Sequence, residues 1–129
     1  MAEHPNVTLV RRAYEAFAKG DFRTILDIMP DDLRWHVPGA NLISGLRTRK
    51  RDVADYFETM AETASKLELE VHDVVGNDEH VVGILRHKHS RWQTQLDIRS
   101  TQVWHVRDGK LVEMWEQLDD IRPWDDFWR

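Results

Sequence analysis

The chain has 129 residues, a formal net charge of −5, 41% hydrophobic residues, six tryptophans and no cysteine. This length favours a single domain, residues 1–129, with a core large enough to need no disulfide or metal support. The lack of cysteine excludes disulfides and thiolate chemistry. An acidic balance of 23 Asp and Glu against 18 Lys and Arg argues against a nucleic-acid module. Six tryptophans against two tyrosines indicate either a pocket lining or a well-filled core.

Membrane and targeting signals are not found in the sequence. No apolar run approaches the roughly 18 residues that a bilayer span requires, and the first residues lack the basic and apolar regions of a secretory signal. We therefore expect a cytoplasmic protein with no membrane partner.

The N-terminal half is expected to form three helices and one short strand. Asn6 can cap an amphipathic helix that ends at Gly20, and Asp21 can cap a second, shorter helix. Residues 33–37 are predicted as a strand, and apolar residues at helical spacing over 53–64 predict the third helix.

The C-terminal half changes to a period of two, which is typical of half-buried strands. The predicted strands of this antiparallel meander are 67–75, 80–90, 94–107 and 110–118. Helices followed by long strands favour an α+β fold in which a curved, mostly antiparallel sheet wraps around the three helices. A C-terminal turn is expected to pack Trp124, Phe127 and Trp128 onto the body of the protein or onto a dimer partner.

The last hairpin decides which side chains share a face. A two-residue type I′ loop would pair Val106 with Leu111, whereas a three-residue loop with a bulge would pair Trp104 with Val112. We favour the three-residue loop. It places one mostly apolar row together: Ser100, Gln102, Trp104, Val106, Val112, Met114, Glu116 and Leu118.

The order of these elements resembles the nuclear-transport-factor-two-like superfamily, and within it the SnoaL-like and ketosteroid-isomerase-like proteins. The resemblance covers nearly the whole chain. Its motifs are Tyr14-Glu15-Ala16-Phe17 with Gly20-Asp21, Trp35-His36-Val37-Pro38-Gly39 with Ser44-Gly45, and the stretch from Val103 to Glu113. It implies a cone-shaped, cystatin-like roll with an apolar pocket between the concave sheet face and the helices, and a homodimer formed through the outer sheet face.

One departure from that family concerns the catalytic base. Ketosteroid isomerases carry a carboxylate just before the proline that ends the first strand, and this chain has Val37 there. Steroid-type proton transfer is therefore not expected.

The candidate catalytic residues have different chemistry. Glu116 and Asp119 could exchange protons, and His36 titrates near neutrality, although strand alternation favours the opposite face for it. Arg86 shares the predicted inward face of Val82 and Ile84 and could hold a carboxylate or enolate, whereas Gln102 could bind a carbonyl or hydroxyl. Structural roles are open for each of them: a pocket rim, a helix cap, an ion pair or a satisfied network.

The remaining pocket residues are apolar or aromatic. They are Tyr14, Phe17, Trp35, Phe57, Val82, Ile84, Trp104, Met114 and Leu118. His87 and His89 are expected on the outer face, and neither metal-ligand spacing nor a phosphate-binding loop is present, so no metal and no other cofactor are predicted.

These observations predict a small hydrophobic ligand with one or two oxygens, bound in the cone. Proton transfer of the isomerase, cyclase or dehydratase type is one hypothesis. A non-catalytic binding or dimerising assembly module is the alternative, and an open or filled cone distinguishes the two.

Overall fold

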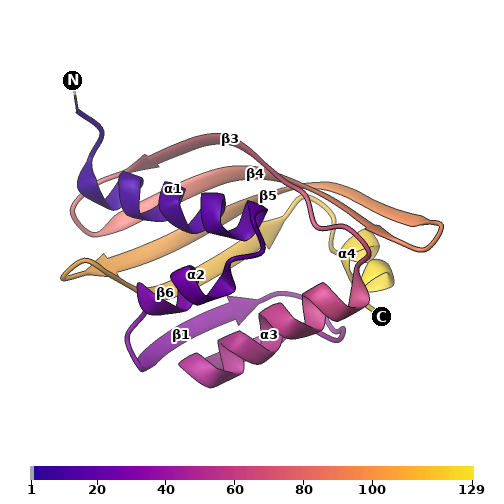
Figure 1. Ribbon diagram of the computed structural model, residues 1–129. Coiled ribbons are helices and arrows are strands. Elements are labelled where there is room, and N and C mark those ends of the chain that lie inside the picture. Colours follow the sequence, from indigo (N-terminus) through magenta and orange to yellow (C-terminus); the bar gives the residue numbers. More distant parts are fainter. Residues whose placement is uncertain (1) are drawn as a thin grey trace.

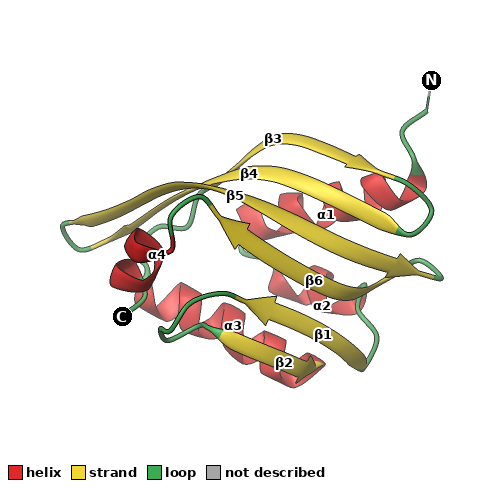
Figure 2. Cartoon of the chain, turned by 180° about the vertical axis from the view of Figure 1, so that it is seen from behind, coloured by secondary structure: helices red, strands yellow, loops and turns green. Residues whose placement is uncertain are grey.

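Three helices cover one face of a six-stranded sheet, and a short fourth helix closes one end (Figures 1 and 2). The computed structural model describes residues 2–129. The helices are α1 (Pro5–Ala18), α2 (Phe22–Asp27), α3 (Lys50–Thr63) and α4 (Ile121–Phe127). The strands are β1 (Asp32–Val37), β2 (Gly45–Arg49), β3 (Leu69–Gly76), β4 (His80–Arg91), β5 (Thr94–Arg107) and β6 (Lys110–Leu118).

The sheet has the order β2-β1-β6-β5-β4-β3, and all its pairs are antiparallel except β1 with β6. The predicted α+β class, with a sheet around three helices, is confirmed. The sequence pattern missed β2, a largely exposed edge strand whose burial does not alternate. Among residues 2–129, no helix is long and apolar enough to cross a membrane.

The first helix begins two residues earlier than predicted. His4, not Asn6, is the N-cap, and its ring accepts a hydrogen bond from the Asn6 amide. Pro5 suits the first helical position because its missing N–H would have no partner there. The side chain of Asn6 instead donates to the carbonyls of Asn77 and Asp78. The second predicted cap, Asp21, accepts from the backbone of α2 as expected.

The β5–β6 hairpin has a two-residue loop, so the predicted three-residue loop is wrong. Asp108 and Gly109 both have positive φ, at 52° and 72°, as a type I′ turn requires. A register shift then occurs beyond the turn, where His105 pairs with Glu113 and Val106 with Leu111. This bulge leaves Val112 unpaired and restores the alternation. Ser100, Gln102, Trp104, Val106, Met114 and Glu116 therefore share the predicted face, with Leu111 in place of Val112.

Strand β4 is rotated by one residue relative to the prediction. Its inner face carries Val81, Gly83, Leu85, His87 and His89, all buried. The predicted inward set (Val82, Ile84 and Arg86) lies on the outer face, where Ile84 is 40% exposed. A one-residue shift exchanges the two faces of a strand completely. In the observed arrangement the long charged side chains of Arg86 and Lys88 reach water.

The six tryptophans lie in different parts of the fold. Trp35 and Trp104 lie in the core, Trp115 lies on the outer sheet face, and Trp92 is exposed at the tip of the β4–β5 hairpin. Trp124 and Trp128 belong to the C-terminal segment, where a helix stands in place of the predicted turn. Their rings are fully buried against the body of the same chain.

Candidate functional site

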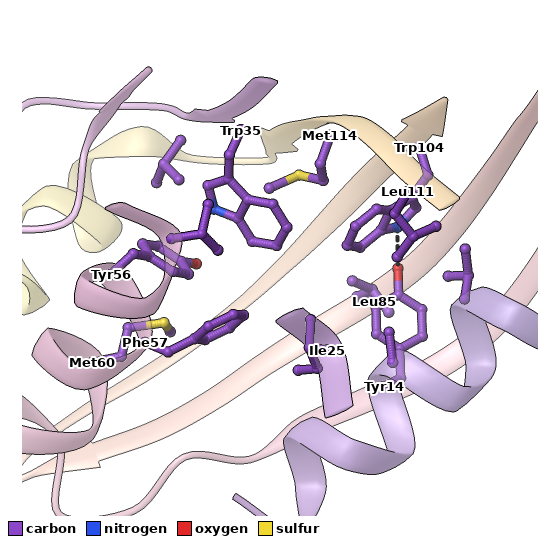
Figure 3. Close-up of a cluster of buried hydrophobic side chains, with 14 of the residues drawn as sticks. Tyr14, Ile25, Trp35, Tyr56, Phe57, Met60, Leu85, Trp104, Leu111 and Met114 are labelled. Carbon is purple, nitrogen blue, oxygen red and sulfur yellow. Dashed lines mark hydrogen bonds between the residues drawn. The ribbon is translucent and has the colours of Figure 1, made fainter. Parts of the chain in front are cut away.

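A row of large side chains crosses the inner sheet face. Trp35 pairs with Met114 across β1 and β6, and Met114 pairs with Trp104 across β6 and β5. Figure 3 shows these side chains facing Tyr56 and Phe57 of α3 and Tyr14 of α1. They nearly fill the cone and leave a cavity of about 30 Å³, which has room for one or two water molecules. Its lining consists of Ala13, Tyr14, Phe17, Ile25, Trp35, Tyr56, Phe57, Met60, Leu69, His87, Gln102 and Trp104.

Glu116 is a fully buried carboxylate on the sheet wall of the cone. Its Oε2 accepts three hydrogen bonds: from His87 Nε2 at 2.7 Å, Ser100 Oγ at 3.0 Å and Gln102 Nε2 at 3.1 Å. Strand pairing explains the arrangement, because Glu116 lies directly opposite Gln102 on β5 and Ser100 is two residues further along the same face. Such a network meets the requirement that buried polar groups be hydrogen-bonded.

A second chain of hydrogen bonds reaches the same carboxylate from α1. The Trp104 indole donates to the Tyr14 hydroxyl at 3.0 Å, and Tyr14 donates to Gln102 Oε1 at 3.0 Å. Gly83 makes this possible, because a Cβ at its position would overlap the Tyr14 hydroxyl. Gln102 is therefore held in one orientation, with its amide nitrogen toward Glu116.

His87, which also lines the cavity, and His89 behind it continue the network. His87 Nδ1 lies 3.0 Å from His89 Nε2, and the Glu68 backbone N–H donates to His89 Nδ1 at 3.0 Å. Burial, with a smaller contribution from His87, lowers the pKa of His89 to about 3. His89 is therefore neutral at physiological pH, in agreement with the hydrogen bond that its Nδ1 accepts.

Two polar groups of the cone wall, Glu116 Oε1 and Trp35 Nε1, are buried with no hydrogen-bond partner among the described residues. The same holds for Trp128 Nε1, which lies outside the cone at the end of α4. Burial raises the pKa of Tyr56, and the charge of Glu116 raises it further. Both causes also raise the pKa of Tyr14, so both hydroxyls remain protonated. Trp35 lines the cavity, and Glu116 is hydrogen-bonded to Gln102, which also lines it. Unpaired buried polar groups are costly, and such groups beside a cavity are typical of a site that a ligand completes.

Three phenylalanines from three different helices stand together beside the cavity. Phe22 of α2 stacks on Phe57 of α3 at 4.8 Å between ring centroids, and Phe17 of α1 lies 6.0 and 6.3 Å from them. Phe17 and Phe22 are only half-buried. The three helices thus meet at the cavity, whose lining includes Phe17 and Phe57.

Only some of the predicted site residues reach the cone. Gln102 and the aromatic residues predicted for the pocket line the cavity. Glu116 lies behind Gln102 and is hydrogen-bonded to it. Arg86 does not: it is on the outer face and forms a two-bonded ion pair with Asp97. His36 is also on the outer face, stacked on Trp115, with Glu113 at 2.7 Å.

A separate hollow of about 920 Å³ lies on the outer side of the sheet. Four residues that were predicted for the cone line this hollow instead: Ile84, Arg86, Leu118 and Asp119. Asp119 is exposed after the end of β6. The one-residue shift of β4 explains why Ile84 and Arg86 lie on the outer face. Leu118 and Asp119 lie at the end of β6, where the strand leaves the cone.

Sequence reasoning missed His87, His89 and Tyr56. The prediction of surface histidines is wrong because it follows from the wrong phase of β4. The sequence did contain a signal. One alternation of β4 places Arg86 and Lys88 on the inner face of the sheet, and the other places two histidines there. Burying a histidine costs less free energy than burying a lysine or an arginine. Among the described residues, no group of three or more His, Asp or Glu side chains could hold a metal ion.

Comparisons with known proteins match this architecture. The family model described as SnoaL-like domain matches residues 10–114. An uncharacterized protein of Mycobacterium tuberculosis is 28% identical over 130 residues, which cover 99% of each chain. Bal32a, from a soil-derived mobile gene cassette, has a TM-score of 0.89 and 29% identity, with 97% of each chain covered.

Two further solved structures share the fold at lower identity. TerC, co-crystallized with polyporic acid, has a TM-score of 0.81 at 20% identity and covers 90% of this chain and 92% of its own. IdmH of Streptomyces antibioticus, a candidate polyketide cyclase, has a TM-score of 0.74 at 19% identity, with 91% and 93% covered. The architecture is thus the cystatin-like, nuclear-transport-factor-two-like cone.

Proposed function

Because the chain belongs to the SnoaL-like domain family, we propose that its cone is a cofactor-free acid–base site for a small apolar molecule with a carbonyl oxygen. The observation that carries this proposal is the asymmetry of Glu116. One carboxylate oxygen accepts three hydrogen bonds and the other accepts none. Three donors leave no place for a proton on Oε2, so a transferred proton binds at Oε1.

The reaction follows from this geometry. Glu116 removes a proton from the carbon next to the ligand carbonyl: the C–H bond breaks, an O–H bond forms at Oε1, and the electron pair moves onto the carbonyl oxygen. The unpaired Trp35 N–H and the Tyr56 hydroxyl are the donors available to stabilise that oxygen. Return of the proton to another carbon completes an isomerisation, and attack of the enolate carbon on a second carbonyl gives a cyclisation.

The ligand class follows from the walls. The phenylalanines lie on the helix side of the cone, whereas Glu116, Gln102 and the Trp35 N–H lie on the sheet side, so a flat ring with one oxygen toward the sheet fits best. Polyporic acid in TerC and the polyketide assigned to IdmH point to the same class of compound. A ligand of this size requires the three phenylalanines to move apart, since the cavity holds only water-sized volume.

Deuterium incorporation tests the proposal. The probe is 2-tetralone in D₂O, followed by proton NMR, together with a thermal-shift screen that includes polyporic acid. We expect the protein to accelerate exchange at the carbon next to the carbonyl and Glu116→Gln to lose about 100-fold or more of that rate. Asp119→Asn is the matched control, because it removes an exposed carboxylate three residues away. Full activity in Glu116→Gln would refute the assignment.

An assembly module is the second candidate, and the small cavity favours it. The outer sheet face carries half-buried Val82 and Trp115 and an exposed Ile84, which lines the 920 Å³ hollow. A homodimer through this face would bury them. Sedimentation equilibrium of the wild type and of Ile84→Lys tests this: a dimer that the substitution dissociates, together with no ligand-induced thermal shift, would favour the module over the enzyme.

A further inference from the structure

The histidine pair at the back of the cone has no free nitrogen. His87 uses Nε2 toward Glu116 and Ser100 and Nδ1 toward His89, and His89 uses Nε2 toward His87 and Nδ1 toward the Glu68 amide. Neither ring therefore has a nitrogen free to hydrogen-bond to a ligand while these bonds last. Any function of the pair must act through Glu116.

The Glu68 amide fixes the direction of the whole chain. A backbone N–H can only donate, so His89 Nδ1 must accept and the proton of the neutral His89 ring is on Nε2. That proton points at His87 Nδ1, which must accept in turn. The proton of His87 is then on Nε2 and is donated to Glu116 Oε2. Protonating His87 on Nδ1 would place two N–H groups against each other at 3.0 Å.

We propose that His87 and His89 are positioning residues: a hydrogen-bond relay whose direction is set by the Glu68 amide and which keeps Glu116 Oε2 occupied and Oε1 free. This inference rests on the proposed role of Glu116. A relay with the opposite direction would present a lone pair of His87 Nε2 both to Oε2 and to the Ser100 hydroxyl, which lies 3.1 Å away. Either Ser100 would turn its O–H from Oε2 to His87, or the carboxyl would carry its proton on Oε2. In both cases Oε2 would lose donors, and Oε1 would no longer be the one oxygen left to accept a proton.

The C-terminal helix covers this relay. Trp124 packs edge-on against His87 at 5.1 Å between ring centroids, and Trp128 packs against His89 at 5.8 Å. Arg91 secures the end of the helix by donating to the carbonyls of Phe127 and Arg129. These rings exclude water, which could otherwise bind either ring nitrogen and allow both tautomers. The relay therefore depends on α4 as well as on β3 and β4.

The tautomers can be measured without any substrate. Long-range ¹H–¹⁵N correlation NMR on the full chain at pH 7 reports which nitrogen of each histidine carries the proton. We expect both His87 and His89 to be neutral, with the proton on Nε2. An Nδ1 proton on either ring, or an imidazolium at His87, would overturn the relay whether or not the protein is an enzyme.

A pair of substitutions tests the positioning role. In His89→Gln the amide oxygen can accept from Glu68 and the amide nitrogen can donate to His87, so the direction is preserved; in His89→Leu it is lost. With 2-tetralone exchange as the assay, we expect His89→Gln to stay within about threefold of wild type. His89→Leu should lose at least tenfold in kcat with little change in KM, and the NMR signal of His87 should shift toward the Nδ1 tautomer.

The outcomes separate the two proposals. Equal kcat in His89→Leu and His89→Gln, both folded by circular dichroism, would overturn the positioning role while leaving Glu116 as the base. If the wild type shows no exchange, the proposed function fails on its own, and the tautomer measurement alone decides the relay. Retention of the wild-type His87 tautomer in His89→Leu would overturn the relay in that case.

Discussion

Replacing His89 by glutamine is expected to weaken the dependence of stability on acid. The pKa of His89 is about 3 in the folded protein because the ring is buried and His87 is adjacent, whereas an unfolded histidine has a pKa of about 6.5. Between these values the unfolded chain binds the proton more strongly. Acid therefore destabilises the fold as pH falls below about 6.5, and the effect is complete only near pH 3.

The magnitude follows from the two pKa values. Between pH 7 and pH 5, protonation of His89 in the unfolded state lowers the free energy of unfolding by about 2 kcal/mol. Few carboxyl groups titrate in that interval, which keeps their contribution small. The rings packed on His89 are Phe17, Phe127 and Trp128, none of them charged, and His87 is the one titratable side chain in direct contact with it among the described residues.

Urea unfolding at pH 7 and pH 5 measures the effect. The wild type should lose about 2 kcal/mol more than His89→Gln over this interval, since glutamine keeps the hydrogen bonds and does not titrate. Every other titrating group is common to both proteins and cancels in the difference. Equal losses in the two proteins would refute the inference that His89 is buried in its neutral form.

Three further substitutions test other parts of the structure. Gly83→Ala should lower the free energy of unfolding by about 1–3 kcal/mol, because the added Cβ displaces the Tyr14 hydroxyl. In a Tyr14→Phe background, urea unfolding should show a smaller loss from Gly83→Ala, because the hydroxyl is already absent. Trp92→Gly should stabilise the protein by about 1 kcal/mol, since the 94%-exposed Trp92 has a φ of 54° that favours glycine; a lower melting temperature would show that the ring has a packing partner. Arg86→Ala should change stability by less than about 1 kcal/mol, since it removes one exposed ion pair. It should also leave ligand-induced thermal shifts unchanged. Loss of the shift in this variant would show that Arg86 takes part in ligand binding.

The helices and the long strands were predictable because their patterns extend over many residues. The second half of β5 and the end of β6 were assigned to the correct face even though the turn between them was not. Two errors compensated: the loop is one residue shorter than predicted, and the bulge at Val112 adds that residue back. A bulge leaves little trace in a single sequence, because it changes the pairing and not the composition.

The site was less predictable than the fold. Glu116 and Gln102 were found because they interrupt an apolar row, whereas His87 and His89 were missed because both faces of β4 carry polar and apolar residues. The Glu68 amide could not have been found, since a backbone group has no signature in the sequence. Which amide meets His89 depends on the path from α3 into β3, where Ser65 and Lys66 also bond to Ser90 of β4.

The buried network is hard to explain as a stabilising device. A carboxylate that loses its water costs several kcal/mol, and apolar residues of similar volume would pack in the same place at equal or greater stability. Stability alone gives no reason to leave Glu116 Oε1 and the Trp35 N–H unpaired. Both of these unpaired groups belong to the sheet wall, while the phenylalanines lie on the helices. A ligand that entered between the helices would meet the sheet with its leading oxygen, so the same asymmetry that costs stability would orient it for proton transfer at Glu116.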